Sequence, residues 1–213
     1  MAASPVTTWR DAHLVAFDLE GSGAQDRDNE AILEVAAVPL ADGIPDAARA
    51  YSSLVNPGRK IRRGPWISPG LTNTVLADAP TLGDVEAQLA GLLNGAVVVG
   101  HNISVDWRLL HRRCPTIAPA GLLDTLRLAK HHRPHDTSRT LTALVEQLDL
   151  TAKTNRLAAA SQPHRALWDA TATGLLLHAI VTASYDDEPT LRHLLDIASR
   201  PLTTSEHDPL RLF

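Results

Sequence analysis

Runs of apolar residues along this chain predict a series of strands. Short apolar segments at 13–17, 31–40 and 51–55 have strand character, with polar or turn residues at their ends. Taken together, these three segments predict a meander. A buried strand is predicted at 96–100, and a shorter strand at Leu122-Leu123.

Apolar residues at helical spacing predict helices between and after these strands. Thr81 and Asp84 have the spacing of a capping box at the start of the first helix. Further helices are predicted at 104–113 and 124–130. Two later helices are indicated by the positions Leu141, Leu144, Val145 and Leu148, and by Leu167, Ala170, Leu175 and Ile180. This order predicts an α/β fold, a mixed β-sheet flanked by α-helices.

The composition is that of a globular domain. The chain has 213 residues, of which 44% are hydrophobic and 21% charged. We divide it into a leader at 1–12, a domain at 13–200 and a tail at 201–213. We expect no secretory signal and no apolar stretch long enough to span a membrane. The single Cys114 excludes an intrachain disulfide framework and favours a cytoplasmic location.

Four acids and one histidine stand in three short clusters spread over the chain. Asp18 and Glu20 are two residues apart, so on a strand both side chains leave the same face. Asp106 lies in the first turn of the helix after the 96–100 strand, and Asp169 begins a later helix. Acids that converge in an apolar frame need neutralisation, and divalent cations prefer oxygen ligands. The clusters therefore predict a metal-dependent nuclease.

Each cluster also has a purely structural interpretation. The first two acids can be a strand end that faces water, and Asp106 can simply complement a helix dipole. Asp169 can pair with Arg165, with His164 on the surface. The joint order of the clusters favours the metal site, beside which a histidine is suited to act as general base.

The motifs resemble those of the DEDD-type 3′–5′ exonucleases of the histidine subclass, which include the proofreading epsilon subunit of bacterial DNA polymerase III. The first motif is similar to Phe17-Asp18-Leu19-Glu20-Gly21-Ser22-Gly23, and the second to His101-Asn102-Ile103-Ser104-Val105-Asp106. The third is similar to the stretch from His164 to Asp169. The resemblance covers about 14–180 and implies an RNase H-like exonuclease fold.

This resemblance implies a metal site and a reaction. Two divalent ions, Mg²⁺ or Mn²⁺, would be held by Asp18, Glu20, Asp106 and Asp169. His164 would act as the general base. The enzyme would release nucleoside 5′-monophosphates one at a time from 3′ ends, and single-stranded DNA is the expected substrate.

Substrate contacts are expected at the edges of the motifs. Gly21 and Ser22 stand where the family has a threonine pair that seats the terminal nucleotide, so we expect an altered grip there. His101 and Asn102 either contact the substrate or shape the turn that contains them.

A positive run at 59–63 precedes Trp66. Arg62 and Arg63 can contact phosphates, and the indole can stack on a base, although a solvated hairpin loop is an equal alternative. We interpret the histidines within 130–139 as a plain loop, because their spacing is irregular for a metal site.

The last residues resemble the short peptide by which many bacterial replication and repair proteins bind the sliding clamp. Leu210, Leu212 and Phe213 would contact the clamp, although Pro209 stands in the usual glutamine position. Packing of these residues on the domain is the alternative.

Two other functions are compatible with the sequence. One is an oligoribonuclease or RNA-trimming exonuclease that reads the 2′-hydroxyl. The other is a non-catalytic nucleic-acid or clamp-binding module that keeps the fold, although the presence of all five predicted site residues counts against it. A DNA repair role is compatible with the exonuclease interpretation.

Overall fold

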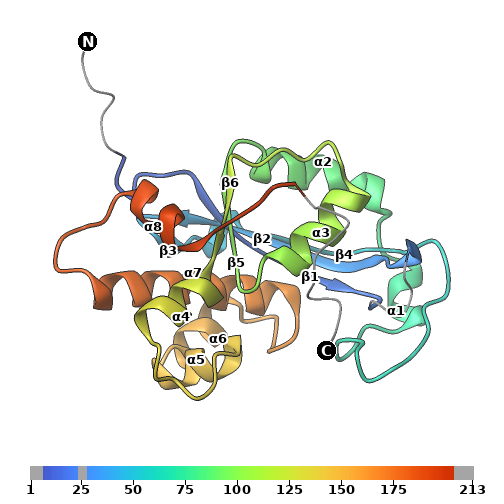
Figure 1. Cartoon of the computed structure of the whole chain (residues 1–213). Coiled ribbons are helices and arrows are strands. Elements are labelled where there is room, and N and C mark those ends of the chain that lie inside the picture. The colour runs from blue at the N-terminus through green and yellow to red at the C-terminus, as the bar shows by residue number, and fades with distance from the viewer. Residues whose placement is uncertain (1–6, 24–27, 204–213) are drawn as a thin grey trace, which may run out of the picture.

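The computed structural model describes residues 7–23 and 28–203, and a mixed β-sheet with helices on both faces forms its centre (Figure 1). The strands are β1 (Leu14–Gly21), β2 (Ile32–Ala41), β3 (Ile44–Pro45), β4 (Tyr51–Leu54), β5 (Val97–Gly100), β6 (Gly121–Asp124) and β7 (Ser199–Arg200). The helices are α1 (Asn73–Ala77), α2 (Leu82–Leu93), α3 (Ser104–Arg113), α4 (Thr125–His132), α5 (Leu141–Gln147), α6 (Thr151–Leu157), α7 (Ala166–Ser184) and α8 (Leu191–Ala198), with a 3-10 turn, η2 (Ala47–Arg49).

The strand order is β3-β2-β1-β5-β6-β7, and β4 also pairs with β2. β1, β2 and β4 are antiparallel neighbours, which confirms the predicted meander. β1, β5 and β6 are parallel, so their carboxyl ends meet at one edge of the sheet. The pairing of β1 with β5 ends at Ala16↔Val99. The second half of β1 therefore extends beyond β5, and this is the half that contains Asp18 and Glu20.

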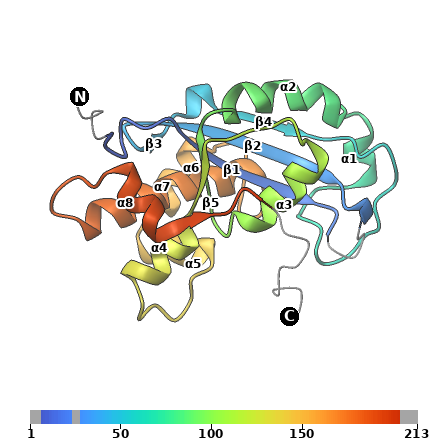
Figure 2. The ribbon, with the colours of Figure 1, turned by 45° about the horizontal axis from the view of Figure 1, so that its top comes forward.

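The two faces of β1 carry different side chains. Val15, Phe17 and Leu19 belong to the core that includes residues of α2 and α3. Ala16 points to the opposite face, where it packs with residues of α7. By the same alternation Asp18 and the acid two residues later lie on the α7 face. Figure 2 shows the sheet between these two helical layers.

Helix α7 is the central core helix of this second layer. It contacts β1 and β2, and its 19 residues are long and apolar enough to cross a membrane by length and composition. The expectation that no such stretch exists was therefore wrong. However, 67% of the stretch is buried inside the protein, and such burial is typical of a core helix. Continuous apolar composition here follows from contact with neighbours on several sides.

The two ends of the described chain pack on the domain. Trp9, within the predicted leader 1–12, is 1% exposed, and its N–H donates to Pro189. Leu202, within the predicted tail, packs against the core and accepts a hydrogen bond from the indole of Trp107. Both described portions are thus part of the folded unit.

The predicted helices agree with the structure apart from one boundary. The capping box of Thr81 and Asp84 is present at the start of α2. α4 continues to His132, so the segment predicted as a loop from residue 130 begins later, at residue 133. The apolar residues Leu128 and Ala129 pack in the core and extend this helix.

Candidate active site

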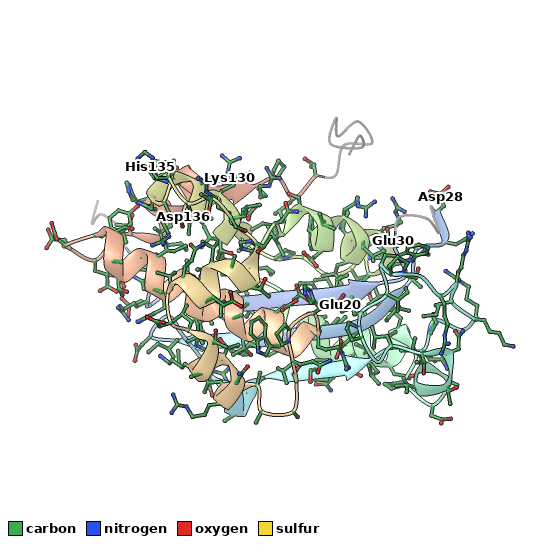
Figure 3. All side chains as sticks on the ribbon, turned by 90° about the horizontal axis from the view of Figure 1, so that it is seen from below. Glu20, Asp28, Glu30, Lys130, His135 and Asp136 are labelled. Atoms are coloured by element: carbon green, nitrogen blue, oxygen red, sulfur yellow. The ribbon has the colours of Figure 1, made fainter. Side chains whose placement is uncertain are left out.

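Three acids from two distant elements meet at the end of β1. Ligand oxygens of Asp18, Glu20 and Asp169 all lie within 4.8 Å of one another. The first two come from β1, and Asp169 lies in the first turn of α7. Figure 3 shows Glu20 beside the start of that helix. Packing of α7 on β1 therefore assembles the cluster that the sequence predicted.

Asp106 approaches from the other layer, in the first turn of α3. Its Oδ1 accepts a hydrogen bond from the N–H of Leu19 at 3.4 Å, and the residue is 9% exposed. This N–H lies beyond the paired part of β5, so the carboxylate supplies the partner that a neighbouring strand would give. The bond places the fourth acid next to Asp18.

The electrostatics show that the four acids are crowded without compensation. Burial raises the pKa of Asp18 well above its ordinary value, and the charges of Asp106 and Asp169 raise it further. Burial raises the pKa of Glu20 to about 7, although a hydrogen bond from Ser68 lowers it. Burial likewise raises the pKa to about 8 for Asp106 and to about 6 for Asp169.

This donor set fits divalent cations. Within 7–23 and 28–203, no ion pair involves any of the four acids. Carboxylate oxygens are the ligands that Mg²⁺ and Mn²⁺ prefer, and an ion would remove the repulsion that raises the pKa values. Asp18, Glu20 and Asp169 are the group best placed to hold a metal, with Asp106 adjacent.

His164 lies exposed just before α7. Its φ of 64° is left-handed, and its N–H donates to Asp169 Oδ1 at 3.4 Å. Arg165 pairs with Glu34, not with Asp169, so the ion pair considered as an alternative is absent from the described structure. The histidine is thus beside the cluster and accessible from solvent.

Ser22 and Gly21 lie at the irregular end of the β1–β2 pairing. Ser22 is 2% exposed, and its hydroxyl accepts from the N–H of Ala31 at 2.9 Å. A Cβ at Gly21 would lie 3.0 Å from Leu109 Cδ2, so the absence of a side chain allows this helix to approach closely. The serine therefore serves the turn between the strands, and its contact with substrate stays a prediction.

His101 and Asn102 shape the turn between β5 and α3. The two ring nitrogens of His101 lie 3.0 Å from Thr125 Oγ1 and 2.9 Å from the carbonyl oxygen of Arg139. Asn102 has a left-handed φ of 64°, and its N–H donates to the buried Asp124 at 2.9 Å. These contacts favour the turn-shaping interpretation over substrate binding.

The loop between β4 and α1 returns to the acids. Trp66 is 36% exposed, and its indole N–H donates to the carbonyl of Ser22 at 3.2 Å. Two residues later, the hydroxyl of Ser68 donates to Glu20. Arg62 and Arg63 are exposed on the same loop. The loop thus presents an aromatic ring and two cations near the cluster.

The histidines of 130–139 form no metal site with the active-site acids. Figure 3 shows Lys130, His135 and Asp136 close to one another and away from Glu20. Arg133 pairs with Asp136. Among the described residues, the acid cluster is the one group of three or more potential ligands that converge.

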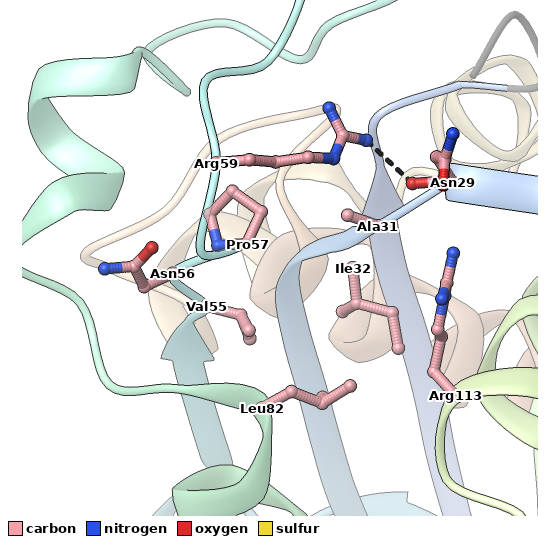
Figure 4. Close-up of a pocket in the computed structure, with 9 residues that line it drawn as sticks. All are labelled: Asn29, Ala31, Ile32, Val55, Asn56, Pro57, Arg59, Leu82 and Arg113. Atoms are coloured by element: carbon pink, nitrogen blue, oxygen red, sulfur yellow. Dashed lines mark hydrogen bonds between the residues drawn. The ribbon is translucent and has the colours of Figure 1, made fainter.

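A separate pocket of about 220 Å³ lies between β2, the end of β4 and α3 (Figure 4). It is lined by Asn29, Ala31, Ile32, Val55, Asn56, Pro57, Arg59, Leu82 and Arg113. Arg59 and Arg113 hold backbone carbonyls of the adjoining segment 28–30. The four acids do not line this pocket, so it is not the catalytic centre.

Sequence reasoning missed three residues that contact the site. Ser68 bonds to Glu20, while Glu34 and Arg165 form an ion pair at the start of α7. A signal for Glu34 was present, because an acid inside the otherwise apolar stretch 32–40 must find a partner. Neither sequence spacing nor motif pointed to Ser68.

The fold is similar to solved exonucleases. Exonuclease X in complex with 5′ overhanging duplex DNA is 27% identical, with a TM-score of 0.65 over 85% of this chain and 98% of that one. The nuclease domain of 3′hExo, a DEDDh family member bound to rAMP, has a TM-score of 0.64 at 13% identity, over 84% of this chain and 96% of that one. The second likeness supports the RNase H-like fold alone.

Sequence comparison points to the same family. The exonuclease (RNase T) family model matches residues 15–177. A DNA polymerase III subunit epsilon-like protein of Rhodobacter capsulatus is 30% identical over 89% of this chain and 25% of its own length. A PolC-type DNA polymerase III of Oceanobacillus iheyensis is 29% identical over 82% and 12%. This chain thus spans a quarter or less of the length of these two relatives. Family model, fold and acid cluster agree, and the chain belongs to the exonuclease family, in its DEDDh branch.

Proposed function

We propose that this chain is a metal-dependent 3′–5′ exonuclease that releases nucleoside 5′-monophosphates from single-stranded DNA. The observation that carries the proposal is the convergence of Asp18, Glu20 and Asp169 within 4.8 Å, with Asp106 beside them. Their crowding favours two divalent cations, Mg²⁺ or Mn²⁺, because a single charge pair would leave other acids uncompensated.

The side chains divide the chemistry between them. Asp18, Glu20 and Asp169 would hold the metal, with Asp106 at the second position. When bound, the cations neutralise the acids, polarise the scissile phosphate and favour ionisation of water. His164, exposed beside Asp169, is placed to accept the proton of the attacking water and to pass it to solvent.

Single-stranded DNA is the favoured substrate, and RNA is the near alternative. Trp66 offers a partly exposed ring for base stacking, and this contact does not depend on the sugar. Arg62 and Arg63 offer positive charge for the approaching backbone. The same features serve a 3′ end of RNA, so the sugar preference must be measured.

The test is hydrolysis of 5′-labelled single-stranded DNA and RNA with Mg²⁺, Mn²⁺ or EDTA. We expect a metal-dependent ladder that shortens from the 3′ end. Asp18→Asn should lose activity by about 10²- to 10³-fold or more, the scale for removal of a group that stabilises developing charge. Asp78→Asn, an exposed acid at the end of α1, is the matched control.

The outcomes separate the alternatives. A steep preference for very short RNA would favour the oligoribonuclease. Retained nucleic-acid binding without hydrolysis under either metal would favour a non-catalytic module. Equal activity of Asp18→Asn and wild type would refute the proposed site.

We further propose that the tail binds a sliding clamp in the cytoplasm, in support of a repair role. Leu210, Leu212 and Phe213 lie outside the described residues, so the sequence pattern alone supports this proposal. Deletion of 210–213 should abolish clamp binding and leave nuclease activity intact. Equal clamp affinity after the deletion would end the idea.

A further inference from the structure

Glu34 and Arg165 form an ion pair beside the acid cluster, from elements 131 residues apart. Arg165 Nε donates to Glu34 Oε2 at 2.7 Å, and Nη2 donates to Oε1 at 2.8 Å. The glutamate side chain is 8% exposed and the arginine side chain 25%. Two parallel bonds of this kind fix the orientation of both groups as well as their distance.

Glu34 occupies a position that ties β2 to the catalytic strand. It lies opposite Glu20 in the β1–β2 register. Its chain neighbours Leu33 and Val35 are fully buried. A carboxylate in this setting is costly unless it is paired, and Arg165 supplies the charge.

Glu34 also caps the helix that contains Asp169. Arg165 is the N-cap residue of α7, and its own side chain makes no cap hydrogen bond. The N–H of Ala166 instead donates to Glu34 Oε2 at 3.3 Å. A carboxylate there satisfies a helix-terminal N–H and complements the positive end of the helix dipole. β2 thus provides the cap that α7 lacks.

His164 depends on the same anchor. It directly precedes Arg165 and has a left-handed φ of 64°, which a non-glycine residue adopts only when its surroundings hold it there. On the other side of the guanidinium lies Gly70, where an added Cβ would be 3.6 Å from Arg165 Nη1. The guanidinium is therefore held between β2 and the loop that contains Ser68.

We propose that Glu34 and Arg165 are positioning residues that hold His164 and Asp169 in register with the acids of β1. The kinetic part of this inference rests on the proposed exonuclease function. The structural part, the ordering of residues 164–169, is independent of it.

The first experiment measures amide hydrogen exchange in the full chain without metal. Arg165→Lys keeps the charge but loses the two-pronged bond, and Glu34→Gln keeps the shape but loses the charge. Both should speed exchange across 164–169 by about tenfold or more, with the later turns of α7 unchanged. Arg192→Lys is the control, because its pair with Asp196 is 86% and 64% exposed.

Unchanged exchange across 164–169 in Arg165→Lys overturns the inference, whatever the nuclease assay shows. If Glu34→Gln fails to fold, Arg165→Lys carries the test, since it leaves no buried carboxylate without a cation. Exchange that rises equally over the whole chain would indicate general destabilisation and would also overturn it.

The second experiment is kinetic. Arg165→Lys should lower kcat by about 10- to 100-fold, with KM changed by about twofold or less. In a His164→Gln background the same change should cause no further loss of kcat, because both act on one step. An additive loss in the double variant, or a loss confined to KM, contradicts action through the histidine.

Mn²⁺ titration gives a readout that needs no substrate. Because Asp169 follows the anchored cap, Arg165→Lys should weaken Mn²⁺ binding by about tenfold. Unchanged Mn²⁺ affinity would refute the role in placing Asp169. If wild type hydrolyses no nucleic acid, the proposed function fails, while exchange and Mn²⁺ affinity still decide the positioning role.

Discussion

The individual acids of the site have a pH-dependent cost. Glu20 ordinarily has a pKa of 4.5, raised here to about 7, and Asp106 goes from 3.8 to about 8, in both cases mainly by burial. Between these limits the folded protein binds protons that the unfolded chain has released. The free energy of unfolding must therefore fall as pH rises through this window.

We accordingly predict that the melting temperature in EDTA falls between pH 5 and pH 8. A shift of one pKa unit is worth about 1.4 kcal/mol, and a domain of this size loses about 2–4 °C per kcal/mol, so the drop should be roughly 5–10 °C. Saturating Mg²⁺ should remove most of it, since the ion stabilises the ionised acids.

Differential scanning calorimetry across this pH range provides the check. Asp106→Asn should flatten the EDTA profile, because one of the shifted groups no longer titrates. A profile in EDTA that is flat for the wild type would contradict the uncompensated cluster.

Among the elements, β5 ends where only glycine fits. A Cβ on Gly100 would lie 2.8 Å from Cβ of Ile103, which is 1% exposed. Gly100→Ala should therefore cost about 1–3 kcal/mol of stability and lower nuclease turnover, because this turn leads into α3 and Asp106. Gly121→Ala in β6 is the matched control, since its Cβ would lie 3.8 Å from Val97 Cγ2. Urea unfolding should separate the two variants, and equal loss would refute the argument.

The short strand β7 stabilises the same turn from the other end of the chain. Arg200 lies 3.4 Å from the carboxylate of Asp124, which is 1% exposed, and donates to Ser104 Oγ at 2.6 Å. Asp124 in turn accepts from the N–H of Asn102.

Arg200→Ala should cost about 1–3 kcal/mol in urea unfolding, because it leaves a buried carboxylate without its cation. Arg192→Ala, at an exposed pair, should cost about 0.5 kcal/mol or less. Similar losses for the two variants would show that β7 contributes nothing specific.

For the whole molecule, net charge and local charge have opposite signs. The chain carries −4, yet Arg62 and Arg63 are exposed on the loop that reaches the acids. Reversal of both to Glu should raise KM for single-stranded DNA about tenfold, leave kcat within about twofold and reduce the salt dependence of binding. Arg49→Glu with Arg192→Glu changes the net charge equally and serves as the control. An equal KM in the two double variants would exclude a local role.

The sequence could predict the elements that have a strong local signal. The capping box of α2 and the apolar strand β5 depend on residues close in the chain, and both are present. The short β3 and β7 carry no such signal, because each is held by pairing with a distant strand. The same applies to the packing of Trp9, which depends on a contact with Pro189.

By itself the sequence determined the family and the acids, because these depend on residue types at short spacings within each motif. Only the tertiary structure decided how the motifs meet. Asp106 reaches β1 because β5 stops short of it, and α7 takes its cap from Glu34 on another strand. Such contacts join positions about 90 to 130 residues apart, and no local pattern encodes them.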